Sequence, residues 1–311
     1  MIDYVHDVWY GNNVKSLGAG YLCDIFDKLE LMKDFNLLSG SANRGIYEQE
    51  LYKHMLEYNP TFDIGDLFGK KLSKSKRKNA YSIEKFTYYP VDRNVIDFSI
   101  PDRKYDIILD LKGALWHYAN DCKMGRKEKK ENIKKYGKSL YKIVYKRKKV
   151  ISLLKHYLEL MKEDNSKLII DNYYTDVKKS VNAKTSFKNY VPAKYKYFVE
   201  YSTYEILNLI VDLDDIKNEI DTYYTSINEK YPLTRYMSIG AINKSTIEKI
   251  IINIETQMDL EVGNMEIVNS YKTASNKTFT KCIQKILCLL VLICLVVFAL
   301  IIILHKCGIY W

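Results

Sequence analysis

Hydrophobic residues recur with helical spacing along most of the chain. Apolar positions at intervals of three and four predict three amphipathic helices. These helices span residues 21–38, 104–122 and 201–220. A further helix is predicted after Ser245, which forms a capping-box pattern with Glu248 and precedes a stripe of isoleucines. Short runs at Phe86–Tyr89 and Tyr195–Val199 are typical of strands, but the pattern as a whole predicts a mainly α fold, a helical globular body.

The longest predicted helix, roughly Lys127 to Glu163, combines an apolar stripe with a dense set of cations. The stripe consists of Ile133, Tyr136, Leu140, Ile143, Val144, Ile151, Leu154 and Leu158. Between Lys123 and Lys149, thirteen basic residues stand against two acids, a net charge of +11 in a chain whose total is +10. A basic amphipathic helix of this kind is typical of contact with an anionic membrane surface or an acidic partner. The residues expected to make this contact are Lys129, Lys130, Lys134, Lys135, Lys146, Arg147, Lys148 and Lys149.

A second basic patch lies in the segment Gly69–Lys78, which has six positive charges and no acid. Its candidate contact residues are Lys74, Lys76, Arg77 and Lys78. The loop at residues 69–79 is also the candidate internal boundary of the body, which is predicted to span residues 1–262. Tyrosines interleave with the lysines of the first patch, and this keeps nucleic acid open as a competing partner.

An uninterrupted apolar segment, Ile286–Leu304, contains nineteen residues without a charged or strongly polar side chain. As a helix it would be about 28 Å long, close to the hydrocarbon thickness of a bilayer. The polar residues 263–281 before it are interpreted as a stalk, and residues 305–311 as a short tail. The segment predicts one C-terminal transmembrane helix.

The orientation of this span is predicted from its flanks and from the N-terminus. The first residues contain early acids and no apolar core of signal-peptide length, and more lysines precede the span than follow it. We therefore expect a tail-anchored, single-pass membrane protein with a cytosolic body. Sequons at Asn243 and Asn276 keep the alternative open, a body exposed at the cell or virion surface.

Catalytic motifs with defined spacing are absent from the sequence. The five histidines occur singly, and there is no CxxC, HExxH, GxSxG, GxxxxGK[ST] or GxGxxG pattern. The sequence thus predicts no metal, no cofactor and a non-enzymatic function. The 28 tyrosines, with abundant lysine, asparagine and isoleucine, indicate a genome rich in A and T. In layout the chain resembles the surface antigens of malaria-type parasites, which implies the alternative of an outward-facing antigen or receptor from an AT-rich parasite or virus.

Residues 34–45, DFNLLSGSANRG, follow an amphipathic pattern and resemble the opening of the nucleotidyltransferase motif. The resemblance implies that the Gly-Ser turn cradles a nucleotide triphosphate, while two nearby carboxylates and a third on a later strand hold metal ions. The acids that follow the turn are Glu48, Glu50, Asp63, Asp66, Asp106 and Asp110. The first two come sooner than the motif requires and the next two later, so a nucleotidyltransferase-like enzyme is the second alternative. The leading hypothesis is an anchored protein that acts by binding.

Overall fold

The computed structural model describes residues 20–40, 45–65, 67, 81–89, 94–111, 113–120, 123–173, 202–224 and 237–263. The chain divides into two units, Met1–Met258 and Asp259–Trp311, and the fold described below belongs to the first. The predicted stalk beyond residue 263, the span and the tail, like the residues of the second basic patch, lie outside the described residues.

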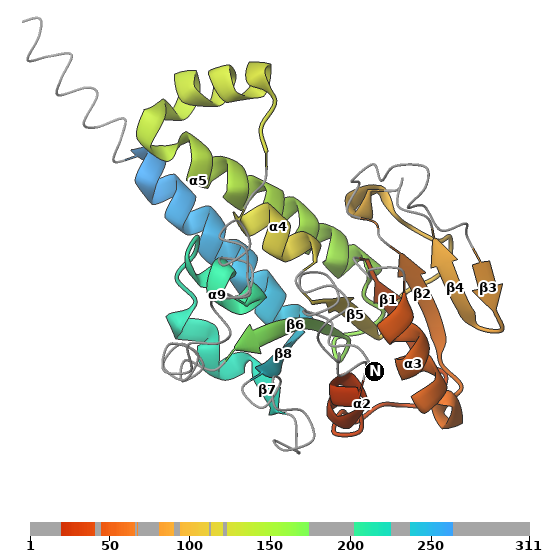
Figure 1. Ribbon diagram of the computed structural model, residues 1–311. Helices are drawn as coiled ribbons and strands as arrows, with labels where there is room; N and C mark the ends of the chain where they lie inside the picture. Colours follow the sequence, from red (N-terminus) through yellow and green to blue (C-terminus); the bar gives the residue numbers. More distant parts are fainter. Residues whose placement is uncertain are drawn as a thin grey trace, which may run out of the picture. The chain divides into compact units, whose positions relative to one another are not determined.

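One mixed sheet of eight strands forms the centre of the first unit (Figure 1). The strands are β1 (Asn36–Ser39), β2 (Thr61–Gly65), β3 (Tyr81–Ile83), β4 (Phe86–Tyr89), β5 (Ile107–Asp110), β6 (Lys167–Tyr173), β7 (Asp221–Tyr224) and β8 (Met237–Asn243). Their order in the sheet is β3-β4-β2-β1-β5-β6-β8-β7. The five strands from β4 to β6 are mutually parallel, whereas β3 is antiparallel to β4, and β8 is antiparallel to both of its neighbours. The arrangement is a doubly wound α/β fold with antiparallel pairing at both edges.

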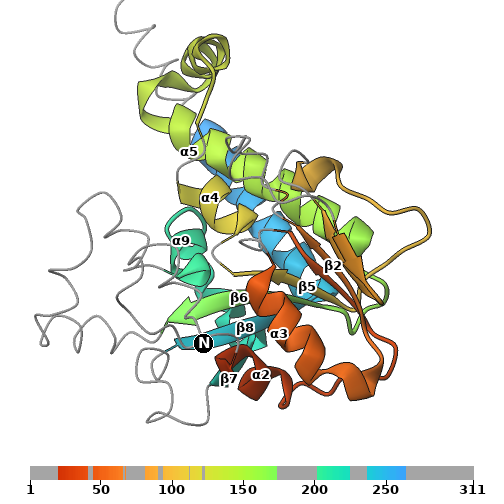
Figure 2. The ribbon, with the colours of Figure 1, turned by 45° about the vertical axis from the view of Figure 1, so that its right-hand side comes forward.

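Helices cover both faces of the sheet (Figure 2). They are α2 (Gly20–Phe26), α3 (Ile46–His54), α4 (Ala114–Asn120), α5 (Arg126–Leu160), α9 (Thr203–Asn208) and the part of a further helix, residues 244–258, that belongs to this unit. Short 3-10 helices occur at η2 (Leu56–Tyr58), η4 (Val95–Asp97) and η6 (Asp214–Glu219). One core cluster joins α2 and α3 to one face, and a larger one joins α4, α5, α9 and the helix beginning at residue 244 to the other. A parallel sheet covered in this way has strands that are apolar on both faces.

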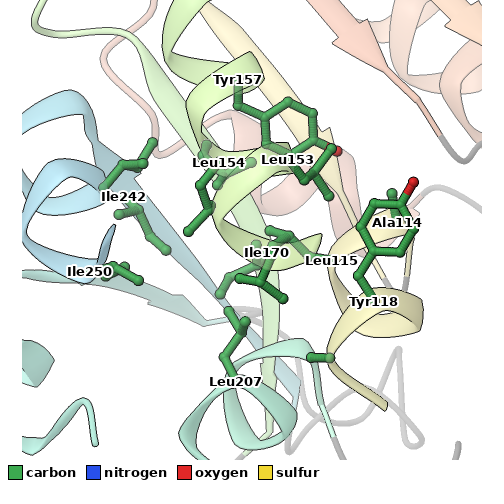
Figure 3. Close-up of a cluster of buried hydrophobic side chains, with 14 of the residues drawn as sticks. Ala114, Leu115, Tyr118, Leu153, Leu154, Tyr157, Ile170, Leu207, Ile242 and Ile250 are labelled. Carbon is green, nitrogen blue, oxygen red and sulfur yellow. The ribbon is translucent and has the colours of Figure 1, made fainter. Parts of the chain in front are cut away.

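Figure 3 shows the centre of the larger core cluster. Ile170 of β6 and Ile242 of β8 contribute the sheet surface, and Leu154 of α5 and Leu207 of α9 cover it. All four side chains are buried. Each buried aliphatic side chain of this size contributes about 1.5–3 kcal/mol relative to an exposed one, so this layer fixes α5 on the sheet.

The expectation of a mainly α body is wrong, because three of the predicted helices contain other elements. The segment 21–38 forms α2 and then β1, and the segment 104–122 forms β5 and then α4. Segment 201–220 forms α9 and a 3-10 helix. In the sequence a buried strand is a short apolar run, and hydrophobic periodicity alone does not distinguish such a run from part of a helix. The run at 86–89 is confirmed as β4, while the run at 195–199 lies outside the described residues.

The sequence-based localisation is corrected as well. Across the described parts of the chain, no helix is both long and apolar enough to cross a membrane. The predicted span at residues 286–304 is not among them. The description of the body as the helical domain of a tail-anchored, single-pass membrane protein is wrong, because the body is an α/β fold built on a parallel sheet.

Candidate functional site

The strand order reverses at β1, which lies between β2 and β5. From β1 the chain first builds outward through β2 and β4, and then returns to place β5 on the other side. In open α/β sheets of this kind, ligands bind outside the carboxyl ends of the strands at such a switch point. The candidate site is therefore the edge where β1, β2 and β5 end.

A glycine-containing turn joins β1 to α3 at this edge. Residues 40–45 read GSANRG, which places Gly40 and Gly45 at the first and last positions of a G-x-G-x-x-G pattern and Ala42 at the middle one. Gly45 has φ 67°, a left-handed conformation that favours glycine, and a Cβ there would lie 3.1 Å from Ile64 Cγ2. A Cβ on Gly40 would lie 3.0 Å from Val95 Cγ2. The positive φ therefore favours glycine at position 45, and the close Val95 side chain leaves little room for a Cβ at position 40.

The two ends of the turn are also joined by a buried hydrogen bond. Ser39, the last residue of β1, donates its hydroxyl to Glu48 Oε1 of α3 at 3.0 Å. Gly45 is the N-cap of α3 and has no side chain that could cap the first amides of the helix. Such a helix start attracts anionic groups through its amides and its dipole.

The end of β2 is tied to the same turn. The Leu67 amide donates to the Gly40 carbonyl at 2.7 Å, and a Cβ on Gly65 would lie 3.0 Å from the Tyr89 carbonyl oxygen. Asp66 stands between Gly65 and Leu67 in the sequence but lies outside the described residues. In nucleotide-binding folds an acid about 20 residues after the glycine turn bonds the ribose hydroxyls, and Asp66 follows Gly45 by 21 residues.

The end of β5 provides a buried carboxylate, Asp110, which is 1% exposed. Its Oδ2 accepts from the Tyr157 hydroxyl at 2.7 Å and from the Leu115 amide at 3.0 Å, so it caps the start of α4. Its Oδ1 has no hydrogen-bond partner among the residues that the structure describes. Burial raises the pKa of Asp110 to about 6, although the hydrogen bonds from Tyr157 and Leu115 act in the opposite direction. An unsatisfied buried oxygen at this edge calls for a functional explanation.

A second buried carboxylate, Asp63 of β2, is fully satisfied. Arg103 Nη1 donates to both of its oxygens, at 2.8 and 2.9 Å, and the hydroxyls of Tyr105 and Tyr89 donate at 3.0 and 3.3 Å. The hydrogen bond with Asp63 raises the pKa of Arg103. Burial, together with the charge of Asp63, raises the pKa of Tyr105. This network anchors the segment before β5 to the sheet, and its carboxylate is fully engaged.

The cations predicted for partner contact lie on α5 in different environments. Lys129, Lys130, Lys134, Lys135 and Lys148 are exposed, and Lys146 and Lys149 are half-buried. Arg147 is 4% exposed and donates to the Ile210 carbonyl at 2.5 Å and to Gln257 Oε1 at 3.3 Å. The structure thus uses Arg147 to join α5 to two other elements, while the five exposed lysines face solvent.

Comparison with solved structures finds methyltransferases at low similarity. The plantazolicin methyltransferase BpumL with S-adenosylhomocysteine (SAH) shares 12% identity at TM-score 0.39, over 73% of this chain and 82% of that chain. CalO1, a methyltransferase in calicheamicin biosynthesis, shares 9% sequence identity at TM-score 0.33, and the match covers 72% of this chain and 54% of that chain. An S-adenosylmethionine-dependent methyltransferase from Aquifex aeolicus shares 11% sequence identity at TM-score 0.32, and the match covers 70% of this chain and 86% of that chain. No family model and no curated protein sequence matches the chain.

The sequence-based interpretation as a non-enzymatic membrane-anchored protein with a mainly helical body is corrected. The described chain has the strand order of a doubly wound α/β fold, and the structures that the comparison finds are methyltransferases. The nucleotidyltransferase alternative is also wrong. Asp63 is bound to Arg103, and within the described ranges no three His, Cys, Asp or Glu side chains are grouped to hold a metal. The sequence did single out residues 40–45, but as the opening of a nucleotidyltransferase motif, because Ala42 stands where a G-x-G-x-x-G pattern has its middle glycine.

Proposed function

We propose that this chain is a methyltransferase that uses S-adenosylmethionine (SAM), bound at the edge formed by β1, β2 and β5. The observation that carries the proposal is the turn at residues 40–45, because it follows the first parallel strand, opens a helix and lies at the switch point. Gly40 and Gly45 fit that role, since the space that a Cβ would fill is already taken by Val95 and Ile64.

Ala42 favours an adenosine cofactor without a pyrophosphate. In dinucleotide-binding turns the middle glycine lets the backbone approach the pyrophosphate, and a methyl group at that position obstructs this approach. The second half of the sheet supports the same choice. A dinucleotide fold repeats a parallel three-strand unit, whereas here the antiparallel β8 separates β6 from β7. One nucleoside site, rather than two, is the arrangement that this topology supports.

Different residues at this edge would bind different parts of the cofactor. Asp66 would accept hydrogen bonds from the ribose hydroxyls, and the first amides of α3 would favour the methionyl carboxylate. Ser39 and Glu48 hold the turn in place by joining its two ends. When bound, SAM supplies a methyl group: a nucleophilic atom of the acceptor bonds to the methyl carbon, the carbon–sulfur bond breaks with its electron pair on sulfur, and the acceptor loses a proton.

Calorimetric titration with SAH tests the proposal without knowledge of the acceptor. We expect SAH to bind, NAD to bind far more weakly, and Asp66→Ala to weaken SAH binding at least tenfold, which corresponds to about 1.4 kcal/mol. Asp164→Ala, a change at an exposed acid in the loop before β6, is the matched control and should leave binding unchanged. Preference for NAD, or SAH binding that is insensitive to Asp66→Ala, would overturn the proposal.

A further inference from the structure

The N-terminal part of α5 bends back on itself at Gly137. This residue has φ 72° and ψ 170°, and it separates two helical legs at residues 126–136 and 138–160. Figure 1 shows the short leg turning into the long diagonal helix. We call residues 126–142 the α5 elbow. The Tyr145 hydroxyl donates to Glu128 Oε2 at 3.2 Å, and Lys148 Nζ donates to the Tyr136 hydroxyl at 2.6 Å, so the two legs are fixed to each other.

The elbow carries a concentrated positive charge that faces solvent. Its exposed lysines are Lys127, Lys129, Lys130, Lys134, Lys135, Lys138 and Lys142. No carboxylate of the described chain forms an ion pair with any of these seven ammonium groups. The ammonium of Lys129 lies 5.9 Å from the centre of the Tyr141 ring, and that of Lys135 lies 5.3 Å from the Tyr136 ring. The charge therefore lies on both legs and is not neutralised by ion pairs with the described carboxylates.

The apolar side of the same helix is not available to a bilayer. Val144, Ile151 and Leu154 are buried in the core, and Tyr136 and Tyr141 are also buried. The large hydrophobic side chains that are exposed in the described chain all lie on other elements. A helix that lies in a membrane interface inserts an exposed apolar face. In the elbow the apolar residues Ile133 and Leu140 are half-buried, and no large hydrophobic side chain is exposed. Its surface suits a hydrophilic polyanion.

The long leg of α5 connects the elbow to the proposed cofactor site, the edge where β1, β2 and β5 end. The Tyr157 hydroxyl contacts Asp110 at the end of β5, and the helix runs from there to Gly137 over 20 residues. At about 1.5 Å per residue this distance is about 30 Å. An extended chain with regularly spaced phosphates can contact the lysines at one end of this path while another of its nucleotides lies at the site.

We propose that the α5 elbow binds the phosphodiester backbone of a nucleic acid, which is the methyl acceptor. The acceptor assignment rests on the proposed function, whereas the binding itself does not. Neutralisation of phosphates by lysines releases counterions. A plot of the logarithm of the binding constant against the logarithm of the salt concentration should therefore have a slope of about −0.7 for each phosphate contacted on a single strand.

Fluorescence anisotropy of labelled RNA and DNA oligonucleotides with the full chain tests this binding. The variant replaces Lys130, Lys134 and Lys138 by alanine; these side chains are exposed and alanine favours the helix. We expect nanomolar-to-micromolar binding that weakens at least tenfold in the variant, with a salt slope less steep by about two. Stronger binding of RNA or of DNA identifies the source of the phosphodiester.

The matched control replaces three exposed lysines away from the elbow, Lys33, Lys53 and Lys217, which should leave affinity and slope nearly unchanged. An equal loss in this control, or no binding of either nucleic acid, overturns the proposal. Binding to phosphatidylserine vesicles in place of oligonucleotides overturns it too. SAH titration of the same preparation separates the two proposals: SAH binding without oligonucleotide binding refutes only the elbow, and the reverse refutes only the cofactor site.

Discussion

Replacing Asp110 with asparagine is expected to stabilise the fold above pH 6. Asparagine has nearly the same shape, and its carbonyl oxygen can accept from Tyr157 and Leu115 as Asp110 Oδ2 does. Its amide nitrogen would occupy the position of Oδ1, which is buried without a hydrogen-bond partner among the described residues. The variant therefore resembles the protonated carboxylic acid, with an amide NH2 group in place of the acid O–H, and it removes the charge.

The magnitude follows from the pKa of Asp110, which burial raises from the ordinary value of 3.8 to about 6 in the fold. Because the folded state holds the proton more tightly than the unfolded chain, protonation of Asp110 stabilises the fold fully below pH 3.8. This contribution is lost as the pH rises through 6. A difference of about two pH units corresponds to about 3 kcal/mol. Asp110→Asn should be equal to the native protein in stability near pH 4 and more stable by about 3 kcal/mol near pH 8.

Urea unfolding followed by circular dichroism, in steps from pH 4 to pH 8, measures both proteins. The difference between them is the informative quantity, because the other titrating groups contribute equally to each. Tyr157→Phe is the companion variant: it removes a hydrogen bond that lowers the pKa of Asp110, so its loss of stability should grow as the pH rises. A difference between native protein and Asp110→Asn that stays constant over this range would refute the reasoning.

Three further substitutions and one control, Gly125→Ala, test the packing of the described fold by urea unfolding at pH 7. Gly45→Ala should cost about 1–2 kcal/mol, because φ is 67° there, whereas Gly125→Ala, with φ −63° and open space at its Cβ, should be tolerated. Arg103→Ala leaves the carboxylate of Asp63 buried without its cation and should cost about 3–5 kcal/mol; a loss below 1 kcal/mol would contradict the network. Arg147→Met removes the hydrogen bond to a buried carbonyl and should cost about 1–3 kcal/mol, while an unchanged midpoint would show that this bond adds nothing.

The sequence predicted elements well where one face of an element is exposed. The run at 86–89 alternates buried and half-buried positions as β4, and the predicted helix from about 127 to 163 corresponds to α5. The parallel strands β1 and β5 were missed, because four-residue runs such as IILD are buried on both faces and show no period. Those two strands define the switch point. Without them the sequence does not show where in the fold the turn at residues 40–45 lies.

The side-chain roles on α5 were harder to predict than the helix. Arg147 stands in a run of four cations, and nothing in the sequence indicates that it alone is buried. Its role depends on the Ile210 carbonyl and on Gln257, which are 63 and 110 residues away in the chain. The apolar pattern likewise predicts a continuous helix through Gly137, whereas the positive φ of this residue creates the elbow. Local patterns do not encode such long-range partners.

Two buried carboxylates in the same sheet illustrate where the fold retains an unfavourable group. Asp63 receives donors on both oxygens, and its charge is balanced by Arg103. Asp110 lies at the carboxyl edge, and its Oδ1 is left without a donor from the described chain, so its ionised form weakens the fold near neutral pH. An unfavourable group at a binding edge is expected where function needs it, because stability and activity often oppose each other at such positions. The asparagine variant that is more stable at pH 8 should therefore bind SAH less tightly, and a variant that gains stability with unchanged SAH affinity would assign Asp110 to the capping of α4 alone.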